Sequence, residues 1–453
     1  MSRDDHLVAG LPRIPRADPV ASTRVEVGVL TALALLVWVG FVALGRTWGL
    51  YLMQAGDHIV LYTPPLLGGY QPNVPAHLWW AAVVGLAGVI VLPRTSTRLR
   101  WWPAVAAGVA GAAAWWVALA LGDGSNGADG LTRGLFWGPD HDTAIVPAAN
   151  DPLGYIRTFV ENLPGGTIQT RAHPPGFQLM MAPLERLGLG GVVPVAIVII
   201  TVALSGLVAV ALTVREVAGE DLARRALPFV ALAPAATWLV ISTDALFAGV
   251  AAWFVFAFAS ATGRTGRRAD VLAVVAGLLA ALLALLSYGL VLMAPIVIAV
   301  AVARRAWRPL LIAGAVASAA VLAFVPLGFW WGAGLLATKH EYDTLGVTRP
   351  YSYFVFNNIG AWALAIGPAT AVALVRLRDR RLWVLVGGAV AAVALADLSG
   401  MSEGEVERIW LPFTLWVLAA GAALGPRPAV VRGWLAVQVM TALVITATVG
   451  TLW

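Results

Sequence analysis

Two acidic residues beyond the N-terminal segment 1–25 are followed directly by a histidine, and the first such pair lies just after the first long apolar run. Asp57 and His58 stand in the stretch MQAGDHIVLY, with no arginine or lysine nearer than Arg46. A carboxylate among apolar side chains at a membrane surface can have its pKa raised enough to act as a general base. The alternative is a solvated loop acid or a helix cap. We predict Asp57 as the catalytic base and His58 as a substrate ligand.

The second pair is part of an acid-histidine-acid run, Asp140, His141 and Asp142, in WGPDHDTAIV. Such a run can bind a divalent metal ion or form hydrogen bonds with sugar hydroxyl groups. Adjacent residues rarely all face one ligand, so we predict contact with a sugar or phosphate and no metal ligand. A divalent cation remains the alternative cofactor, and a plain turn after the Gly-Pro pair competes with both.

Arg171 and His173 precede two prolines in TRAHPPGFQLMMAPLERLG. Pro174 favours an extended backbone at His173, and Pro175 suits the first turn of a helix. The following residues alternate as an amphipathic helix that ends at Gly188, which predicts a helix lying in the membrane interface. Arg171 and His173 are therefore predicted to meet an anionic lipid headgroup or substrate. A rigid structural elbow is the competing interpretation.

Cations, acids and aromatic residues are concentrated in two later segments. The predicted substrate ligands there are Lys339, His340, Glu341, Arg349 and Tyr351 in ATKHEYDTLGVTRPYSYF, and Glu405 and Arg408 in SEGEVERIW. Arginine and lysine suit a phosphate group, and aromatic rings suit a sugar face. Glu405 and Arg408 are also spaced i, i+3, so an ion pair between them is the simpler account.

Asp244 and Tyr288 are isolated polar residues at the ends of apolar runs. Tyr288 is predicted to be a further substrate ligand. An acid at the end of a membrane helix is a functional candidate, although Asp244 can also serve as a helix cap.

The elements that position these residues are apolar runs. Hydrophobic residues make up 60% of the 453 residues and charged residues only 12%, against about 25% charged in soluble proteins. Runs of about 20 apolar residues can cross a bilayer. The fold class is therefore an all-α, polytopic integral membrane protein with 11 to 13 spans. The thirteen predicted spans are 26–45, 78–93, 101–121, 188–212, 226–241, 244–262, 271–287, 289–303, 309–331, 356–375, 382–396, 409–425 and 434–452. The pairs 226–262 and 271–303 can each be read instead as one bent or re-entrant unit.

Basic residues are distributed unevenly between the two sets of loops. Of the 30 basic residues, 22 fall on alternate connections that begin with the N-terminal segment. The positive-inside rule then predicts a cytoplasmic N-terminus and, for an odd number of spans, an outer Trp453. We predict a disordered cytoplasmic tail at 1–25 without a cleavable signal peptide, and one transmembrane domain at 26–453 in the plasma membrane. Its outer loops are 46–77, 122–187, 332–355 and 397–408. The basic excess orients helices and does not indicate nucleic-acid binding, and the lack of cysteine excludes thiol chemistry and disulfides.

Several segments resemble the GT-C superfamily of polytopic glycosyltransferases, which use polyprenyl-phosphate sugars. PAATWLVISTDALFAGVAAWFVF and GLLAALLALLSYGLVLMAP are similar to its middle region, and RPYSYFVFNN and SEGEVERIWLPF to its actinobacterial members. The resemblance implies that Asp57 matches the acid of the first outer loop and that 122–187 carries interfacial helices. Asp57-His58 replaces the double acid of other members, which leaves metal dependence open.

The resemblance also implies the partners and the reaction. A sugar passes from decaprenyl phosphate to a glycan or lipoglycan acceptor of the cell envelope at the outer face of the lipid bilayer. Methylthioxylose is the first expectation for the sugar, and arabinofuranose or mannose the next. The opposing class is a lipid-linked sugar flippase or another transporter, which needs polar residues deep in discontinuous spans. Most predicted spans consist of Ala, Val and Leu, and a non-catalytic scaffold would not need acids and histidines massed outside. An enzyme is therefore favoured.

Overall fold

Helices make up almost all of the chain that the structure describes. The computed structural model describes residues 24–450 apart from 58, 60, 123–129, 136, 241 and 345–348. Within these residues the only other regular elements are four two-residue strands, so the predicted all-α class is confirmed. Most of the predicted tail at 1–25, and Trp453, lie outside the described residues.

Nine helices in the described part of the chain are long enough and apolar enough to cross a membrane, which makes this a membrane-embedded protein. They are α1 (Arg24–Gln54), α2 (Ala76–Arg98), α3 (Trp101–Gly122), α9 (Val192–Ala218), α11 (Thr243–Thr262), α12 (Gly266–Leu286), α16 (Tyr351–Arg376), α17 (Arg380–Leu398) and α20 (Pro428–Thr448). Shorter apolar helices are η6 (Tyr288–Met293) with α13 (Ala294–Arg304), α14 (Trp307–Leu322), and α19 (Leu411–Leu418) with η7 (Ala419–Leu424).

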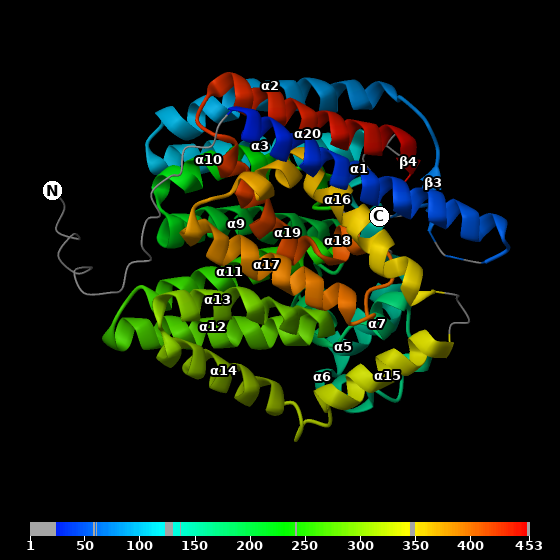
Figure 1. Ribbon diagram of the computed structural model, residues 1–453. Coiled ribbons are helices and arrows are strands. Elements are labelled where there is room, and N and C mark those ends of the chain that lie inside the picture. Colours follow the sequence, from blue (N-terminus) through cyan, green and yellow to red (C-terminus); the bar gives the residue numbers. More distant parts are fainter. Residues whose placement is uncertain are drawn as a thin grey trace.

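Short elements gather at one end of this bundle, on the right of Figure 1, where α5, α6, α7, α15 and α18 are labelled. The helical ones are η2 (Arg133–Leu135), α4 (Trp137–Asp140), the π-helix η3 (His141–Ile145), α5 (Val146–Asn150), α6 (Pro152–Thr158), η4 (Leu163–Gly165), α7 (Ile168–Ala172), α8 (Gly176–Arg186), α15 (Trp331–Thr344) and α18 (Val406–Ile409). The predicted amphipathic helix is α8, and Gly188 follows it with a φ of 72°.

The strands join the first outer loop to the end of the last helix. β1 (Tyr62–Thr63) and β2 (Leu66–Leu67) form an antiparallel hairpin. β3 (Gly69–Tyr70) pairs with β4 (Val449–Gly450), which directly follows α20. The segment after α1 and the segment after α20 therefore lie at the same end of the bundle.

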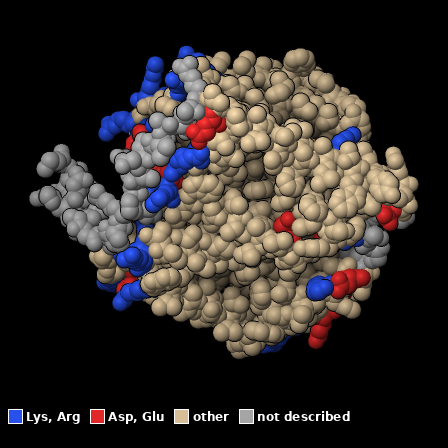
Figure 2. Space-filling view, viewed as in Figure 1, with Lys and Arg blue, Asp and Glu red and all other residues tan. Residues whose placement is uncertain are grey.

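Charged side chains are concentrated at the ends of the bundle. Figure 2 shows arginine side chains gathered along one edge, opposite the end that carries the short helices, with a broad uncharged surface between. Large apolar side chains such as Val29, Leu33 and Leu36 on α1 are more than half exposed on that surface. An apolar surface of this extent is what lipid chains would cover.

The centre of the bundle is α11, whose sequence is apolar on every side and which packs on α9, α12 and α19. Gly206 of α9 and Gly249 of α11 allow these two helices to touch. A Cβ atom built on Gly206 would lie only 2.8 Å from the Cα atom of Gly249. Small residues at a contact of this kind let membrane helices pack at close range, and the contact fixes where α11 begins.

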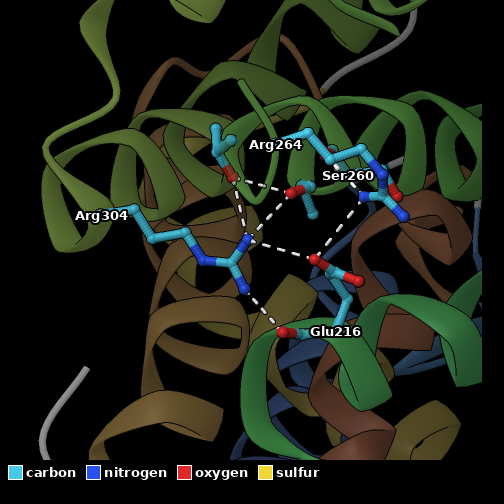
Figure 3. A network of polar contacts seen from close by, with 6 residues as sticks. Glu216, Ser260, Arg264 and Arg304 are labelled. Atoms are coloured by element: carbon cyan, nitrogen blue, oxygen red, sulfur yellow. Dashed lines mark hydrogen bonds and ion pairs between the residues drawn. The ribbon is translucent and has the colours of Figure 1, made fainter. Parts of the chain in front are cut away.

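Arg304 ties three helix ends together at the arginine-rich end (Figure 3). Its Nη1 donates to the carbonyl oxygen of Ala259 at 2.9 Å and to the hydroxyl of Thr262 at 3.1 Å, and its Nη2 donates to the carbonyl oxygen of Glu216 at 2.6 Å. The carboxylate of Glu216 lies 3.7 Å from both Arg304 and Arg264. The last carbonyl groups of a helix lack intrahelical donors. This network supplies donors for α9 and α11 and anchors α13 beside them.

Two elements depart from simple continuous helices. The predicted span 226–241 is wrong as a single helix: α10 (Glu220–Ala231) ends early and the 3-10 turn η5 (Pro234–Thr237) follows. Pro234 has no amide hydrogen with which to continue the helix. α16 is kinked at Gly367, which has a φ of 72° and packs against Pro234. The amide of Gln438 fills the kink, because its Nε2 donates to Ile366 and its Oε1 accepts from the amide of Ala369.

Candidate functional site

An arginine and two carboxylates meet where α11 begins. Arg408 Nη1 lies 2.5 Å from Asp244 Oδ2, and Arg408 Nη2 donates to Glu405. The side chains of Arg408 and Asp244 are only 9% and 5% exposed. The ion pair predicted from the i, i+3 spacing is confirmed. The reading of Asp244 as a helix cap is wrong, because Ser242 occupies the N-cap position and the carboxylate of Asp244 binds Arg408.

The turn before α18 aims these side chains at α11. Gly404 and Glu405 both have positive φ values, 91° and 59°, and for a non-glycine residue this conformation is rare and costs energy. Burial lowers the pKa of Arg408, but the carboxylates of Glu405 and Asp244 outweigh this effect and raise it. Arg408 therefore stays charged in a site that is closed to solvent.

His173 lies beside this cluster. As predicted, its backbone is extended, with φ −133° and ψ 155°, between α7 and α8. Its Nδ1 is 2.9 Å from the carbonyl oxygen of Gln169, and its ring centroid is 5.7 Å from that of Phe247. Burial lowers the pKa of His173, although the nearby carboxylates of Asp244 and Glu405 act in the opposite direction. A neutral imidazole therefore faces the ion cluster.

Glu407 is the most deeply buried carboxyl group near the cluster, with 1% of its surface exposed. Burial raises its pKa to about 7, Glu405 adds to this, and the Leu67 amide of the first outer loop is among the groups that lower it. Leu61 of the same loop packs near Gly404, where an added Cβ would lie 3.2 Å from its side chain. The first outer loop thus covers α18.

A small pocket of about 20 Å³ lies next to His173. Polar side chains of its wall are Asp140, Gln169, His173, Gln178 and Thr243, and the phenyl rings of Phe177 and Phe247 also line it. Thr243 directly precedes Asp244, so the pocket and the ion cluster are neighbours at the start of α11. A space of this volume holds roughly one water molecule or one hydroxyl group.

Asp140 and its neighbours brace the far wall of the pocket. The Asp140 carboxylate accepts a hydrogen bond from Thr167, the N-cap residue of α7. Burial raises the pKa of Asp140 and outweighs that hydrogen bond. Asp142 next to it is exposed, so the run does not converge on one ligand. In the described part of the chain, no group of three or more His, Asp and Glu side chains is arranged to hold a metal ion.

His141 is held between two carboxylates. Its Nδ1 lies 2.9 Å from Asp142 and its Nε2 lies 2.8 Å from Glu185 of α8. Burial lowers the pKa of His141, but the hydrogen bonds to Glu185 and Asp142 prevail and raise it. The imidazole therefore links η3 to α8 on the outer side of the pocket.

The substrate ligands predicted in the segment 332–355 differ in their ion pairs and in their exposure. Arg171 of α7 lies 3.4 Å from Glu341 of α15, which joins two outer segments. Lys339 pairs with Asp343 at 3.2 Å, and both are mostly exposed. His340 is exposed. Of these residues, Arg171 and Glu341 are the half-buried pair that can shape the site.

Arg349 connects this segment to the ion cluster. Its Nη1 donates to the carbonyl oxygen of Glu403 at 2.7 Å, and its guanidinium lies 6.0 Å from the ring centre of Tyr342. Arg349, Glu405 and Arg408 are all close enough to Tyr342 to act electrostatically on its hydroxyl group. The hydroxyl group of Tyr351 donates a hydrogen bond to the carbonyl oxygen of Leu398 and not to a member of the ion cluster.

Asp57 lies on the loop that covers α18, just after α1. Its side chain is exposed, and its carboxylate forms no hydrogen bond with another described residue. No helix starts after it, so the helix-cap reading is wrong. His58 lies outside the described residues. Asp57 therefore remains a prediction as a base, on a loop that touches the cluster.

A large apolar cavity of about 460 Å³ lies between α11, α12, α13 and α14. Phe254, Val297 and Val321 line it, and its wall at the short-helix end includes Trp330 and Trp331. The Trp331 indole donates to the carbonyl oxygen of Ala284 at 2.8 Å. Cavities of this size and character accommodate apolar ligands.

The same end of this cavity adjoins the polar site. Tyr288 is buried with its ring 5.2 Å from that of Trp331. A Cβ atom on Gly176, the first residue of α8, would lie 2.3 Å from the carbonyl oxygen of Leu285. Since α8 also supplies Phe177 to the small pocket, α12 and α8 form the partition between the two spaces.

Sequence reasoning did not select Thr243, Gln178 or Glu407 as site residues. Gln178 lies within the predicted amphipathic helix. Its position on the buried face of that helix is the sequence feature that could have indicated a site residue. Glu407 interrupts an apolar stretch next to Arg408. Comparison of the chain with protein-family models, curated proteins and solved structures finds no match.

Proposed function

We propose that the protein is a membrane glycosyltransferase of the GT-C type, which transfers a sugar from a polyprenyl phosphate to a glycan or lipoglycan acceptor. One observation carries the proposal. The buried Asp244–Arg408–Glu405 cluster and its polar pocket adjoin, at one end of the bundle, an apolar cavity of about 460 Å³. A polyprenyl-phosphate sugar combines a long apolar chain with an anionic, hydroxyl-rich head. The apolar cavity suits the chain, and the charged and polar side chains at the end of the bundle suit the head.

The proposed topology has thirteen crossings with the N-terminus in the cytoplasm. Pairing of β3 with β4 supports an odd number, because β3 follows the first long helix and β4 follows the last. Nine long and three shorter apolar helices make twelve crossings, and α10 with η5 supplies one more. The arginine-rich edge in Figure 2 supports the orientation by the positive-inside rule. The polar site then faces the outside of the plasma membrane.

The chemistry requires one base and one stabilised leaving group. The acceptor oxygen attacks the anomeric carbon, the bond from this carbon to the phosphate oxygen breaks, and polyprenyl phosphate leaves with the electron pair. The acceptor proton passes to a carboxylate. We assign this role to Asp57, because its exposed carboxylate is free of hydrogen bonds within the described chain. The carboxylate of Asp244 is already engaged by Arg408.

The phosphate is assigned to the cations around Tyr342. Arg408 already donates to two carboxylates, so a phosphate must compete with them there. Arg349 has one guanidinium nitrogen bound to a backbone carbonyl, and its remaining donors can form charge-assisted hydrogen bonds with a phosphate. Arg349 is therefore the first candidate for the phosphate ligand. Arg171 and Lys339 are additional candidates.

The sugar and the acceptor follow from the resemblance alone. Methylthioxylose is proposed first and arabinofuranose or mannose next, with a lipoglycan of the cell envelope as acceptor. The reaction as written needs no nucleotide and no metal ion as co-reactant, and a divalent cation remains the alternative for charge neutralisation at the phosphate.

A lipid-linked sugar flippase is the second candidate, and one observation favours it. The break between α10 and η5 meets the kink of α16 at Gly367, deep in the bundle, and discontinuous helices form the binding sites of many transporters. Gln438 satisfies the freed backbone groups at this kink. A kink whose backbone groups are already hydrogen-bonded supports a static structural role, so a glycosyltransferase is preferred over a flippase.

Reconstitution separates the two functions. The purified protein in liposomes is given decaprenyl phosphate that carries radiolabelled methylthioxylose, arabinofuranose or mannose, together with a lipoglycan acceptor. A glycosyltransferase moves label to the acceptor in detergent as well as in liposomes. A flippase moves label across the bilayer without forming a glycosidic bond, and that result would overturn the proposal.

A further inference from the structure

The turn between α2 and α3 carries three arginines that no acidic side chain neutralises. Arg94, Arg98 and Arg100 are all exposed, and within the part of the chain that the structure describes none of them forms a hydrogen bond or an ion pair through its side chain. The sequence holds no aspartate or glutamate between residues 58 and 122. Positive charge of this kind attracts an anionic group.

Two other arginines hold this turn in place from its inner side. Nη1 of Arg224 donates to the carbonyl oxygens of Ser96 and Leu99 at 2.9 and 2.8 Å. The guanidinium of Arg215, near the end of α9, lies 4.5 Å from the ring centre of Trp101. These contacts place the turn at the arginine-rich end of the bundle, and they fix the backbone that carries the three free arginines.

Arg94 and Arg98 continue the exposed apolar face of α2. Val83, Ile90 and Val91 are exposed on this face. Residues three, four or seven positions apart lie on one side of a helix, so Arg94 and Arg98 follow Ile90 at one and two turns. Lipid chains cover an apolar face of this kind, and long basic side chains at its end reach the headgroups.

The length of α2 places these arginines at the level of lipid headgroups. Trp79 and Trp80 are exposed at the start of the helix, and tryptophans mark the interface between membrane and water. The helix rises roughly 28 Å from Trp79 to Arg98, which is close to the hydrocarbon thickness of about 30 Å. Trp102 at the start of α3 is exposed beside the turn and marks the second interface.

We propose that Arg94, Arg98 and Arg100 bind the phosphate group of an anionic phospholipid, whose acyl chains cover the apolar face of α2. The inference goes beyond the proposed function and does not depend on it. Arg94 and Arg98 are spaced i, i+4, so both guanidinium groups can donate to one phosphate. A phospholipid supplies negative charge at the turn and apolar chains on the adjoining helix face, whereas a soluble anion supplies only the charge.

Native mass spectrometry of the full chain in detergent tests the proposal. The probes are phosphatidylglycerol and phosphatidylcholine with identical acyl chains. The wild-type protein should bind phosphatidylglycerol more tightly than phosphatidylcholine. Arg94→Gln/Arg98→Gln should weaken phosphatidylglycerol binding at least about tenfold and leave phosphatidylcholine binding unchanged, because two cations near the phosphate are lost. Unchanged phosphatidylglycerol binding in this variant would overturn the inference and leave these arginines with a role in helix orientation only.

The double variant Arg225→Gln/Arg308→Gln is the matched control. Arg225 pairs with Asp221, and Arg308 donates two hydrogen bonds of 2.9 Å to Asp270. The control removes the same charge but no free guanidinium, so it should bind phosphatidylglycerol like the wild type. Both double variants should elute like the wild type in size-exclusion chromatography, because none of the four side chains is buried. An equal loss of binding in both variants would assign the effect to net charge and overturn the site.

Thermal melting separates a lipid from a small anion. Phosphatidylglycerol should raise the Tm of the wild type more than that of Arg94→Gln/Arg98→Gln. Glycerol 3-phosphate carries the phosphate without acyl chains, and at the same concentration it should raise neither value. Equal protection of the wild type by glycerol 3-phosphate and by the lipid would replace the lipid with a soluble anion and overturn the proposal.

Discussion

Arg408 and Asp244 form a buried ion pair 2.5 Å apart although 164 residues separate them in the sequence. The pair connects α18, one of the short helices at the end of the bundle, to the first turn of the central helix α11. It therefore fixes the short-helix end of the bundle to its core, at the point where the small polar pocket lies.

Breaking this pair should destabilise the fold. Asp244→Ala leaves Arg408 buried with one carboxylate in place of two, and loss of one partner of a buried pair costs about 3–5 kcal/mol. The double variant Asp244→Ala/Arg408→Leu should lose less than the sum of the single changes, because neither Asp244 nor Arg408 is left as a buried charge without its partner, and only the partly exposed Glu405 loses its ion pair. Unfolding in detergent measures each value. The exposed pair partner Lys339 is the control, and Lys339→Ala should cause no measurable loss. Additive losses in the double variant would argue against a coupled pair.

Asp57→Asn should abolish sugar transfer without affecting the fold. The amide keeps the shape of the side chain but cannot take a proton, and loss of a positioned base costs about 10²–10⁴-fold in rate. Transfer from a synthetic polyprenyl-phosphate sugar measures the effect, with size-exclusion chromatography as the test of folding. Glu161→Gln, another exposed acid in the outer segments, is the control with normal activity. Near-normal rates for Asp57→Asn would move the base to Asp140 or Asp142.

Arg349→Ala should weaken binding of the donor phosphate. Hydrogen bonds between charged groups contribute about 1.5–3 kcal/mol, so kcat/KM should fall at least about tenfold. Arg349→Lys keeps the charge but loses the planar fork of donors, and should recover only part of the loss. The comparison is made across donor concentrations. Wild-type kinetics in both variants would exclude Arg349 from the phosphate site.

Glu407 should make stability depend on pH. Burial raises its pKa to about 7 in the folded protein, above the value of about 4.3 expected for the unfolded chain. The folded state therefore holds this proton more tightly. The stabilisation is complete below about pH 4 and is lost as pH rises to about 7, by about 4 kcal/mol in total. Glu407→Gln should flatten this slope in melting curves, and Glu161→Gln should not. Parallel profiles for the wild type and Glu407→Gln would contradict the assignment.

Labelling of single cysteines should define the orientation. The chain has no cysteine, so any label reports the introduced site. Asp142→Cys and His340→Cys lie on exposed positions of the short-helix end, and Arg267→Cys lies on an exposed position of the arginine-rich end. In intact cells an impermeant maleimide should label the first two and not the third. The opposite pattern would place the polar site in the cytoplasm.

The apolar composition determined the all-α class and most of the long helices, because a chain in lipid must satisfy its backbone hydrogen bonds locally. Spacing within single elements determined α8, its end shortly before Gly188, and the Glu405–Arg408 pair. All of these depend on residues a few positions apart, where helix geometry alone sets the distance.

Contacts between distant segments were decided only by tertiary packing. No periodic pattern joins Asp244 to Arg408, or Gln178 to Thr243 in one pocket. The break after α10 also depends on packing, since Pro234 sits against the kink at Gly367 of a helix far along the chain. Local sequence sets which backbone turns are allowed, but the burial of a polar group depends on which helices close around it. That closure gave Glu407 its raised pKa and left Gln178 with an unpaired oxygen.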